Sequence, residues 1–188
     1  GTFLYGAMRD WPEHSGATSG GVVDPAQRNR FPEDRQADDA ADAKRGRMAA
    51  HMVWRLAPDE ALIVEMDAHD GFWIFNMGNV FVGSSDFLYR PVSYTPARTK
   101  IGADNVVRFV IAHDDPLVHN WLDTQGFPEG NLTYRNLMSR NPASFRTRLV
   151  KRADLAAALP ADTAMVTPEE RVRQLHDRYR SIKLRFGI

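Results

Sequence analysis

Apolar and polar residues alternate over short segments in the middle of the chain, and Gly, Pro and Asp separate these segments. Met52–Leu56 and Ala61–Met66 stand on either side of a turn at Pro58, which predicts a meander of neighbouring strands. Residues 51–152 are therefore expected to form the core of a jelly-roll-like β-sandwich. Five further strand-like segments cover residues 72–79, 87–95, 106–112, 131–137 and 145–151.

The segment FWIFNMGN is the most aromatic of these strands. We place Phe72, Ile74 and Met77 on one face and Trp73 and Phe75 on the other. Bulky apolar side chains on both faces predict a strand that is buried on both sides.

Residues 153–188 carry the signals of helices. Asp154–Leu159 predicts a short helix, and Thr167-Pro168-Glu169-Glu170 matches a capping box with proline at the first helical position. We expect the longer helix to dock through an apolar stripe and to present a solvated cationic face, with anion binding as the alternative role of that face. The stripe contains Val172, Leu175, Tyr179, Ile182 and Phe186. The cations are Arg171, Arg173, Arg178, Arg180, Lys183 and Arg185.

Residues 1–50 have a different texture, dominated by Gly, Pro, Ser and charged residues. SGATSGG and RFPED are successive turn signals, and the few apolar residues are scattered. This predicts an extended N-terminal arm that packs on its own core or on a neighbouring subunit. The whole chain is thus expected to be mainly β, with an extended arm before the sandwich and a C-terminal α-helix after it.

Charge and composition exclude several classes of protein. Lys plus Arg equals Asp plus Glu at 24 each, so no overall field attracts nucleic acid, although residues from Arg146 onward hold ten basic against five acidic side chains. The chain has no cysteine, which excludes disulfides and thiolate chemistry. No apolar run reaches the length of a membrane span, so we expect a soluble protein and favour the cytoplasm.

Residues 104–126 contain the densest group of chemically versatile side chains. An apolar strand over Val106–Ala112 is followed directly by polar residues that donate, accept, titrate or ligate. Sites are often built where a rigid strand delivers a polar loop, so this stretch is our candidate site. Its polar and aromatic residues are His113, Asp114, Asp115, His119, Asn120, Trp121 and Asp123.

Metal binding is one interpretation of this group. His113 and His119 together with Asp114, Asp115 and Asp123 include the residue types that bind zinc, iron or manganese. Their spacing matches none of the compact metal motifs, and Asp and Asn beside a proline commonly fix a turn. We therefore expect neither a metal nor another cofactor here.

Acid–base chemistry is a second interpretation. If the loop and Arg135 converge, the guanidinium binds a carboxylate while Asp115 or His119 moves a proton, which makes Asp115, His119 and Arg135 the candidate catalytic residues. The plainer alternative is a structural ion pair, in which Asp115 or Asp86 pairs with Arg135 or Arg90 and locks a loop to a strand. No GxSxG elbow supports a serine hydrolase.

Four segments carry a resemblance to a known family: FWIFNMGNVF, SSDFLYRPVS, VVRFVIAHDDPLVHNWLDTQGFPEGNLTYR and LPADTAMVTPEERVRQLHDRYRSIKLRF. Together these segments, within residues 50–188, resemble the bacterial proteins that carry the domain of unknown function 1214. The resemblance implies a β-sandwich, but the family name assigns no activity. One departure is that Tyr94 and Asn105 stand where relatives show an Asn and a DG turn. The matching positions are Trp73, Asp86, Arg90, Ser93, Asp115, Pro116, Asn120, Trp121, Gly126, Gly130 and Arg135.

We favour a β-sandwich that binds a small, partly apolar molecule, with a carboxylate on that molecule as an option. The expected ligand-binding residues are Trp73, Asp86, Arg90, Asn120 and Trp121. Two alternatives remain open. One is a cofactor-free acid–base enzyme, and the other is a subunit of a homo-oligomer held together by the N-terminal arm.

Overall fold

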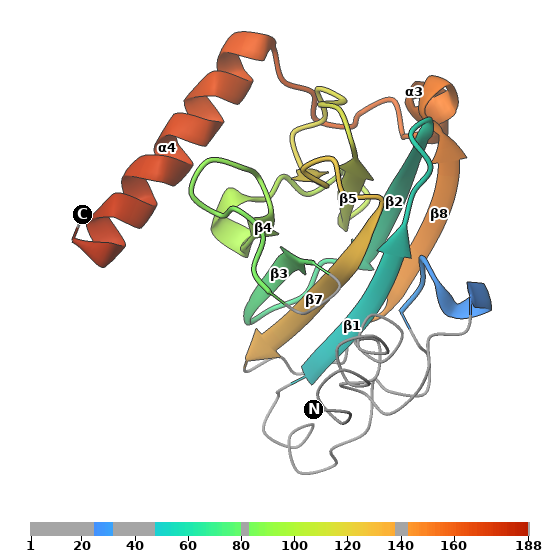
Figure 1. The fold of residues 1–188 in the computed structure, drawn as a ribbon, viewed down its shortest axis with the longest axis horizontal. Coiled ribbons are helices and arrows are strands. Elements are labelled where there is room, and N and C mark those ends of the chain that lie inside the picture. Colours follow the sequence, from blue (N-terminus) through green and yellow to red (C-terminus); the bar gives the residue numbers. More distant parts are fainter. Residues whose placement is uncertain (1–24, 32–47, 80–82, 138–142, 188) are drawn as a thin grey trace, which may run out of the picture.

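The computed structural model describes residues 25–31, 48–79, 83–137 and 143–187, which fold into two four-stranded β-sheets packed face to face (Figure 1). A long helix stands at one side of the sandwich. The mainly β fold with a C-terminal helix is therefore confirmed. Most of the predicted N-terminal arm lies outside the described residues.

The first sheet is antiparallel throughout. Its strands, in spatial order, are β1 (Met48–Arg55), β7 (Glu129–Leu137), β3 (Phe72–Gly78) and β4 (Ser93–Tyr94). The second sheet is mixed, because β5 and β6 are parallel. Its strands are β6 (Trp121–Asp123), β5 (Val106–Ala112), β2 (Glu60–Asp67) and β8 (Phe145–Lys151).

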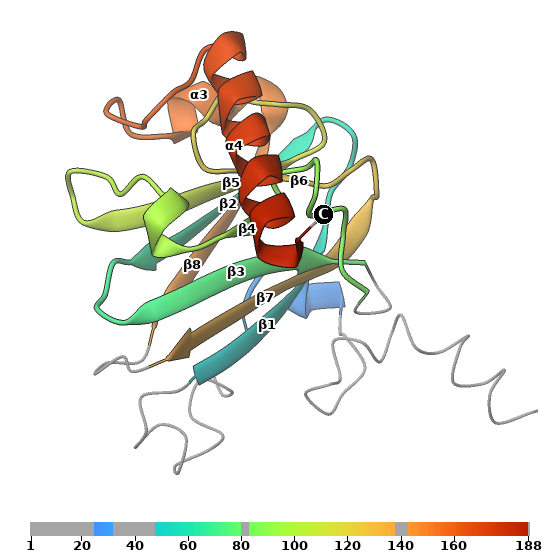
Figure 2. The same ribbon diagram turned by 90° about the vertical axis from the view of Figure 1, so that its left-hand side faces the viewer.

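Five helical elements accompany the sheets in the described ranges. Three are single 3₁₀ turns, η2 (Pro25–Gln27), η3 (Pro96–Arg98) and η4 (Arg152–Asp154). Two are α-helices, α3 (Leu155–Ala158) and α4 (Pro168–Phe186). In both ribbon views α4 lies beside β4 (Figure 2). Within the described part of the chain, no helix has the length and apolarity that crossing a bilayer requires.

The predicted meander is wrong, because β1 and β2 lie in different sheets. β1 pairs with β7, whereas β2 pairs with β5 and β8. Trp54 on β1 and Val64 on β2 are both buried in the core between the sheets. The turn at Pro58 therefore carries the chain across the sandwich, so that the two apolar faces meet instead of lying side by side.

Aromatic rings fill the core between the sheets. The ring centroids of Phe75 and Phe109, from opposite sheets, are 4.8 Å apart, and those of Phe75 and Tyr134 are 5.0 Å apart. Trp73 meets Phe109 edge to face at 6.3 Å. Such contacts add to the free energy gained from burying the rings. They give the sandwich a rigid interior on which outer elements can be mounted.

Burial on both faces occurs in β2 and β5 rather than in β3. The inner side of β3 holds Trp73, Phe75 and Met77, while Phe72 on the outer side is 47% exposed. The predicted separation of Trp73 and Phe75 from Phe72 and Ile74 is confirmed, but the predicted face of Met77 and the burial of both faces are wrong. A second apolar cluster covers the outer face of the second sheet. Ile63 and Val110 belong to it, and Leu155 of α3 and Trp121 pack over them.

Residues 25–31 run along the free edge of β1. The Asn29 N–H donates to the Val53 carbonyl at 2.9 Å, and the Asn29 side chain exchanges two hydrogen bonds with the backbone of Arg55, at 2.8 and 2.9 Å. Phe31 enters the core and stacks on Phe145 at 4.2 Å. This part of the predicted arm therefore packs on its own domain.

Gly130 in β7 tests the packing between β1 and β3. A Cβ there would lie 2.5 Å from the Gly78 carbonyl oxygen and 2.7 Å from Cζ2 of Trp54, neither of which can move freely. We expect Gly130→Ala to lower the free energy of unfolding by about 1–3 kcal/mol, measured by urea denaturation. Gly83→Ala is the control, since the nearest atoms belong to the Asn79 side chain at 3.2 Å. Equal stability of the two variants would contradict the packing described.

Candidate functional site

The loop between β5 and β6 holds the segment that leads into α4. The His119 N–H donates to the Ala164 carbonyl at 2.8 Å, and the Val166 N–H donates to the Leu117 carbonyl at 2.8 Å. Asp115 supports the loop by accepting the Leu117 N–H at 2.8 Å, at a residue with φ of 59°. The predicted polar loop thus binds the backbone of the segment that leads into α4.

α4 begins at Pro168 with the predicted capping box, which the structure confirms. Thr167 Oγ1 accepts the Glu170 N–H at 3.2 Å, and the Glu170 carboxylate accepts the Thr167 N–H at 2.8 Å. These bonds satisfy two donors that a helix start otherwise leaves unpaired. Capping at this point defines where α4 begins.

The face of α4 that meets the sandwich combines two of the predicted cations with part of the predicted apolar stripe, since Leu175, Tyr179 and Ile182 are half-buried. The buried residues of α4 are Arg171 and Arg178, whereas Val172 is 66% exposed. The expectation of a cationic face in water is therefore wrong for two of its six members. Sequence patterns assign arginine to the outside, but a guanidinium can be buried where carbonyls and carboxylates receive its donors.

Arg171 is 5% exposed and uses its full set of donors. Its Nε donates to Asp115 at 2.9 Å, and its two terminal nitrogens donate to Asp115, to the Val118 and His119 carbonyls and to Gln174. These five bonds equal the number of N–H groups on a guanidinium. The group also lies over the Trp121 ring, 5.3 Å from its centroid. Arg171 is thus fully occupied in joining α4 to the loop.

Asp115 therefore has a structural partner, Arg171, that the sequence analysis did not name. The pairing agrees with the idea of an ion pair that locks the loop, but the arginine comes from α4 and not from β7 or residue 90. Both carboxylate oxygens accept hydrogen bonds from this buried guanidinium, at 2.9 and 3.2 Å. The structure places Asp115 beneath α4 as part of the scaffold.

Asn120 is also fully engaged within the protein. Its Oδ1 accepts the Lys100 N–H at 3.0 Å, and its Nδ2 donates to the carbonyls of Lys100 and Arg108 at 2.7 and 2.9 Å. Asn120 thereby holds the segment after η3 against β5. Asn120 was predicted to bind a ligand, but its side chain instead holds one wall of the site in place.

His119 lies next to Asn120. Its Nδ1 is 3.0 Å from Asn120 Oδ1, and since this oxygen accepts, Nδ1 carries the proton and Nε2 stays an acceptor. Burial lowers the pKa of His119, the bond to Asn120 opposes this shift, and the charges of Lys100 and Arg171 lower the pKa further. The neutral ring is therefore the stable form near pH 7.

Arg178 contrasts with Arg171, from which it is two helical turns away. It is 7% exposed, yet it makes only two hydrogen bonds, both to Ser93, at Oγ (3.0 Å) and at the carbonyl oxygen. Its guanidinium lies 5.6 Å from the Tyr94 ring centroid. Among the described residues no carboxylate pairs with it. Three of its N–H donors thus have no hydrogen-bond partner among the described residues.

A groove of about 530 Å³ lies between α4 and the segment around η3. Arg178, Leu175 and Gln174 contribute from the helix, and residues 97–100 form the facing wall. Tyr94 and His119 lie between the walls. A volume of this size is typical of sites for small molecules.

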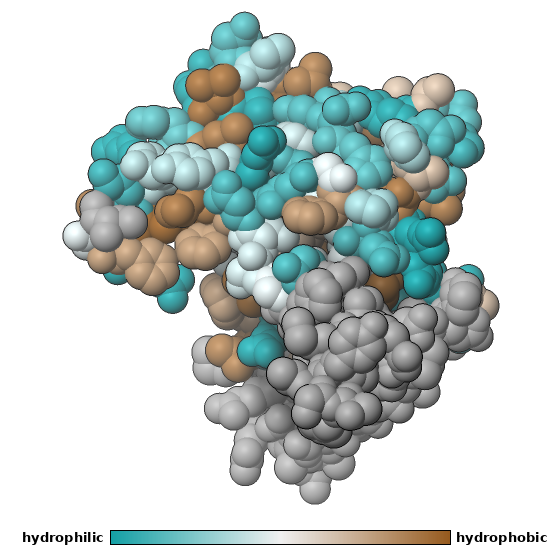
Figure 3. Space-filling view, viewed as in Figure 1, coloured by the Kyte–Doolittle hydropathy of each residue, from teal (hydrophilic) through white to brown (hydrophobic). Residues whose placement is uncertain are grey.

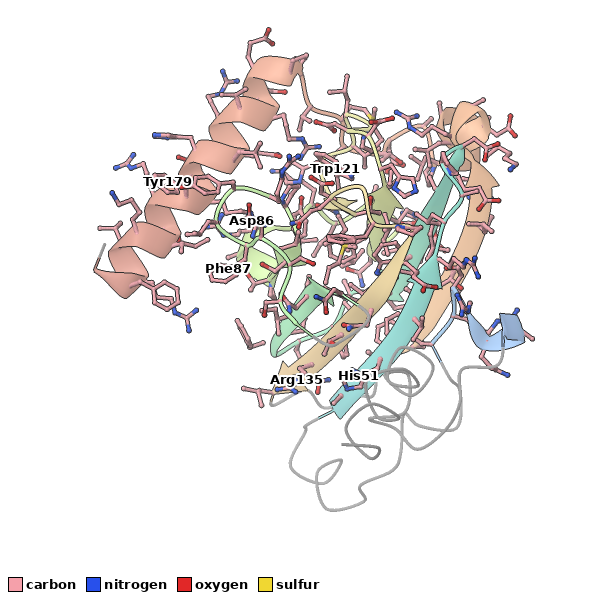
Figure 4. All side chains as sticks on the ribbon, in the orientation of Figure 1. His51, Asp86, Phe87, Trp121, Arg135 and Tyr179 are labelled. Carbon is pink, nitrogen blue, oxygen red and sulfur yellow. The ribbon has the colours of Figure 1, made fainter. Side chains whose placement is uncertain are left out.

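Arg135, Asp115 and His119 do not form the predicted catalytic group. Arg135 projects from the exposed face of β7 near His51, at the end of the molecule away from Trp121 and Asp86 (Figure 4). β7 belongs to the first sheet, whereas the loop follows β5 of the second sheet. The convergence assumed from the sequence is therefore wrong for Arg135.

The two predicted tryptophans belong to the interior and do not line the groove. Trp73 is buried between the sheets, and Trp121 packs in the outer cluster while its Nε1 donates to the Ala112 carbonyl at 3.2 Å. Asp86 accepts the N–H groups of Leu88 and Tyr89 at 3.0 and 3.2 Å and so fixes its own turn. These residues shape the scaffold.

Arg90 pairs with Asp123 at 3.1 Å, as an ion pair between a loop and a strand end. Burial raises the pKa of Asp123, and its bond to Gln125 and the charge of Arg90 oppose that shift. Arg90 is half exposed and lies outside the groove lining. Arg90 therefore forms a structural ion pair, as the plainer alternative expected, but its partner is Asp123 and not Asp115 or Asp86.

The C-terminal half of α4 is attached through aromatic rings. Tyr179 stacks on Tyr89 with centroids 5.4 Å apart, and Phe186 approaches Phe87 at 6.3 Å (Figure 4). The surface there is hydrophobic, as the brown side chains at the end of α4 show (Figure 3), and Leu184 and Phe186 are exposed in it. Both ends of the helix are thus fixed, and the groove lies between them.

Sequence reasoning missed the residues that give the groove its charge, Arg98, Lys100 and Arg178. Arg178 was assigned to a solvated face, and the anion-binding alternative was the only signal that pointed to it. Arg98 and Lys100 lie in the segment ARTKIG, in which apolar and polar residues show no periodicity that would mark a site. Their proximity to α4 arises from the long-range contact between Arg171 and Asp115, which the pattern of α4 does not reveal.

Comparisons with known proteins bear mainly on the fold. No family model matches the chain, and no curated protein matches it, so the resemblance described above stays a prediction. An uncharacterized protein from Burkholderia cenocepacia matches with 28% identity and a TM-score of 0.60, over 68% of this chain and 36% of that one. The VPA0106 protein from Vibrio parahaemolyticus matches with 14% identity and a TM-score of 0.39, over 55% and 31%. The chain spans about a third of the length of these structures.

Asp115→Asn tests the anchor of α4. Removing the carboxylate leaves the buried charge of Arg171 without a counter-ion, so we expect the free energy of unfolding to fall by about 2–3 kcal/mol in urea denaturation. Arg173→Gln is the control, because its pair with Glu170 is exposed and 3.9 Å long, and its loss should cost less than about 0.5 kcal/mol. A change for Asp115→Asn as small as the control's would refute the anchoring role.

The lowered pKa of His119 predicts a dependence of stability on pH. Below about pH 6.5 the unfolded chain binds a proton that the folded ring resists, so the unfolding free energy should fall as the pH falls through that value toward the folded pKa. His119→Gln should reduce this slope, measured by denaturation between pH 5 and 8. The pKa of His51 is also lowered, chiefly by burial, and its share of the slope should persist. An unchanged slope in His119→Gln would contradict the assignment.

Proposed function

We propose that the domain binds a small, partly apolar molecule through an acidic group that is held by Arg178 in the groove beside α4. The observation that carries this proposal is the unused hydrogen-bonding capacity of a guanidinium that is 7% exposed. Taking a charge out of water is costly unless partners compensate it. A carboxylate with two oxygens matches the fork of an arginine and supplies that compensation.

Arg171 supports this interpretation by comparison. It lies on the same helix face and has equal burial, yet protein groups satisfy all of its donors. Burial of an arginine on this face of α4 is therefore compatible with full pairing, which Arg178 lacks. Since Arg178 lines the groove, its spare donors are available to a bound molecule.

The rest of the groove favours a ligand with an apolar part. Pro91, Tyr94, Ala97 and Leu175 contribute apolar surface to the lining. An aromatic or aliphatic body can pack on these side chains while the acidic group meets Arg178. The acid–base alternative has no comparable support, because Asp115 is committed to Arg171 and Arg135 lies elsewhere.

Titration calorimetry with benzoate and with its neutral analogue benzamide tests the proposal. Benzoate should bind with a dissociation constant of roughly 1 mM or below, and benzamide at least about tenfold more weakly, because only the anion pairs with Arg178. Arg178→Gln should abolish the preference for benzoate. Ala97→Trp changes an exposed lining residue and should block the groove without disturbing the buried contacts of α4.

Arg180→Gln is the matched control. Arg180 lies on the same helix but is exposed and outside the groove lining, so its variant loses the same charge without losing the site. Benzoate affinity should stay within about twofold of the unmodified protein. Equal binding of benzoate and benzamide, or benzoate binding that survives Ala97→Trp, would overturn the proposal.

A further inference from the structure

We infer that the ligand carries two separated acidic groups, one seated on Arg178 and the other on the facing wall at Arg98 and Lys100. This inference rests on the proposed function and extends it from one acidic group to two. The ligand class is a dicarboxylate or another molecule with two acidic groups at a distance.

The lining has an excess of positive charge. Arg98, Lys100 and Arg178 are cations, and Asp177 is the single carboxylate among the lining residues, which gives three positive charges against one negative with His119 neutral. In the described part of the chain, neither Arg98 nor Lys100 has an ion-pair partner. A monoanion on Arg178 therefore leaves a positive charge uncompensated, whereas a dianion balances the lining.

The cations occupy two different walls. Arg178 projects from α4, while Arg98 ends η3 and Lys100 follows it two residues later. The groove of about 530 Å³ lies between these two walls. A second group on the ligand can reach the wall that the first leaves free, which favours separated charges over a single doubly charged head.

Both walls are held in place by buried groups. Asn120 binds the N–H and the carbonyl of Lys100 at 3.0 and 2.7 Å, and Thr99 Oγ1 closes η3 on the Thr95 carbonyl at 2.8 Å. Arg178 is held by Ser93 and by the face of Tyr94. The backbone positions from which Arg98 and Lys100 project are therefore fixed relative to Arg178, which favours ligands of a suitable length.

Electrostatic coupling across the groove agrees with this arrangement. The pKa of Arg178 is lowered, mainly by burial, with the charge of Arg98 adding to the shift while Tyr94 opposes it. The charge of Lys100 likewise contributes to the lowered pKa of His119. Arg98 thus acts on Arg178 from the facing wall, and an anion between them relieves that repulsion.

Calorimetry of the full chain with four probes at pH 7.5 and constant ionic strength tests the inference. The probes are benzoate, isophthalate, terephthalate and phenyl phosphate, which vary the number and the separation of negative charges on one ring. At least one of the two dicarboxylates should bind about tenfold or more tightly than benzoate. Phenyl phosphate, with both charges on one head, should fall below the better dicarboxylate.

The variant Arg98→Gln/Lys100→Gln should bring the dicarboxylate affinity down to about that of benzoate and change benzoate affinity by less than about threefold. Arg180→Gln should leave the advantage of the dicarboxylate intact. Dicarboxylates that bind no better than benzoate, or phenyl phosphate as the tightest probe, would overturn the two-group ligand while the proposed function stands. Failure of all four anions to bind would overturn the proposed function itself and the inference with it.

Discussion

The contact between Arg171 and the loop after β5 is the interaction on which the rest of the site depends. α4 shares few apolar contacts with the sandwich, so a single guanidinium with five hydrogen bonds and an aromatic face beneath it fixes where the helix begins. The capping box fixes the residue at which the helix begins. Because α4 forms one wall of the groove, the geometry of the groove follows from this anchor, although Arg171 itself does not line the groove.

Two arginines on one helix face illustrate how similar burial leads to different roles. Arg171 meets a carboxylate, two carbonyls and an amide, while Arg178 meets only Ser93 and the Tyr94 ring. The difference comes from what the sandwich presents at each level: a loop with polar groups near Trp121, and a two-residue strand, β4, lower down. A buried cation can thus act as scaffold or as site, and only the count of its partners separates the two cases.

The sequence was informative where local patterns decide structure and uninformative where distant contacts do. Val106–Ala112 and Phe145–Lys151 were predicted with the observed bounds, because alternation and turn residues mark such strands clearly. Trp121–Asp123 was treated as loop, since a three-residue parallel strand leaves no periodic signal. The crossing of the chain between the sheets at Pro58 was missed because it depends on pairing with strands that are distant in the sequence. At the site, the stretch around Asp115 was correctly identified as a structured loop, but its partner is 56 residues away and in a helix whose basic side chains were assigned to water.

Asn29 has a consequence for how this domain behaves in a crowded solution. Strands at the border of a sheet offer unpaired amides and carbonyls that can recruit a strand from another molecule and start fibrous aggregation. Here β4 and β6 are too short to serve as templates, and β8 carries Arg146, Arg148 and Lys151. β1 is the longer border strand. At its C-terminal end the Asn29 side chain hydrogen-bonds to the N–H and the carbonyl of Arg55, as the backbone of a neighbouring strand would. Asn29, which takes no part in the core or in the groove, thus protects this end of β1 from pairing with another molecule.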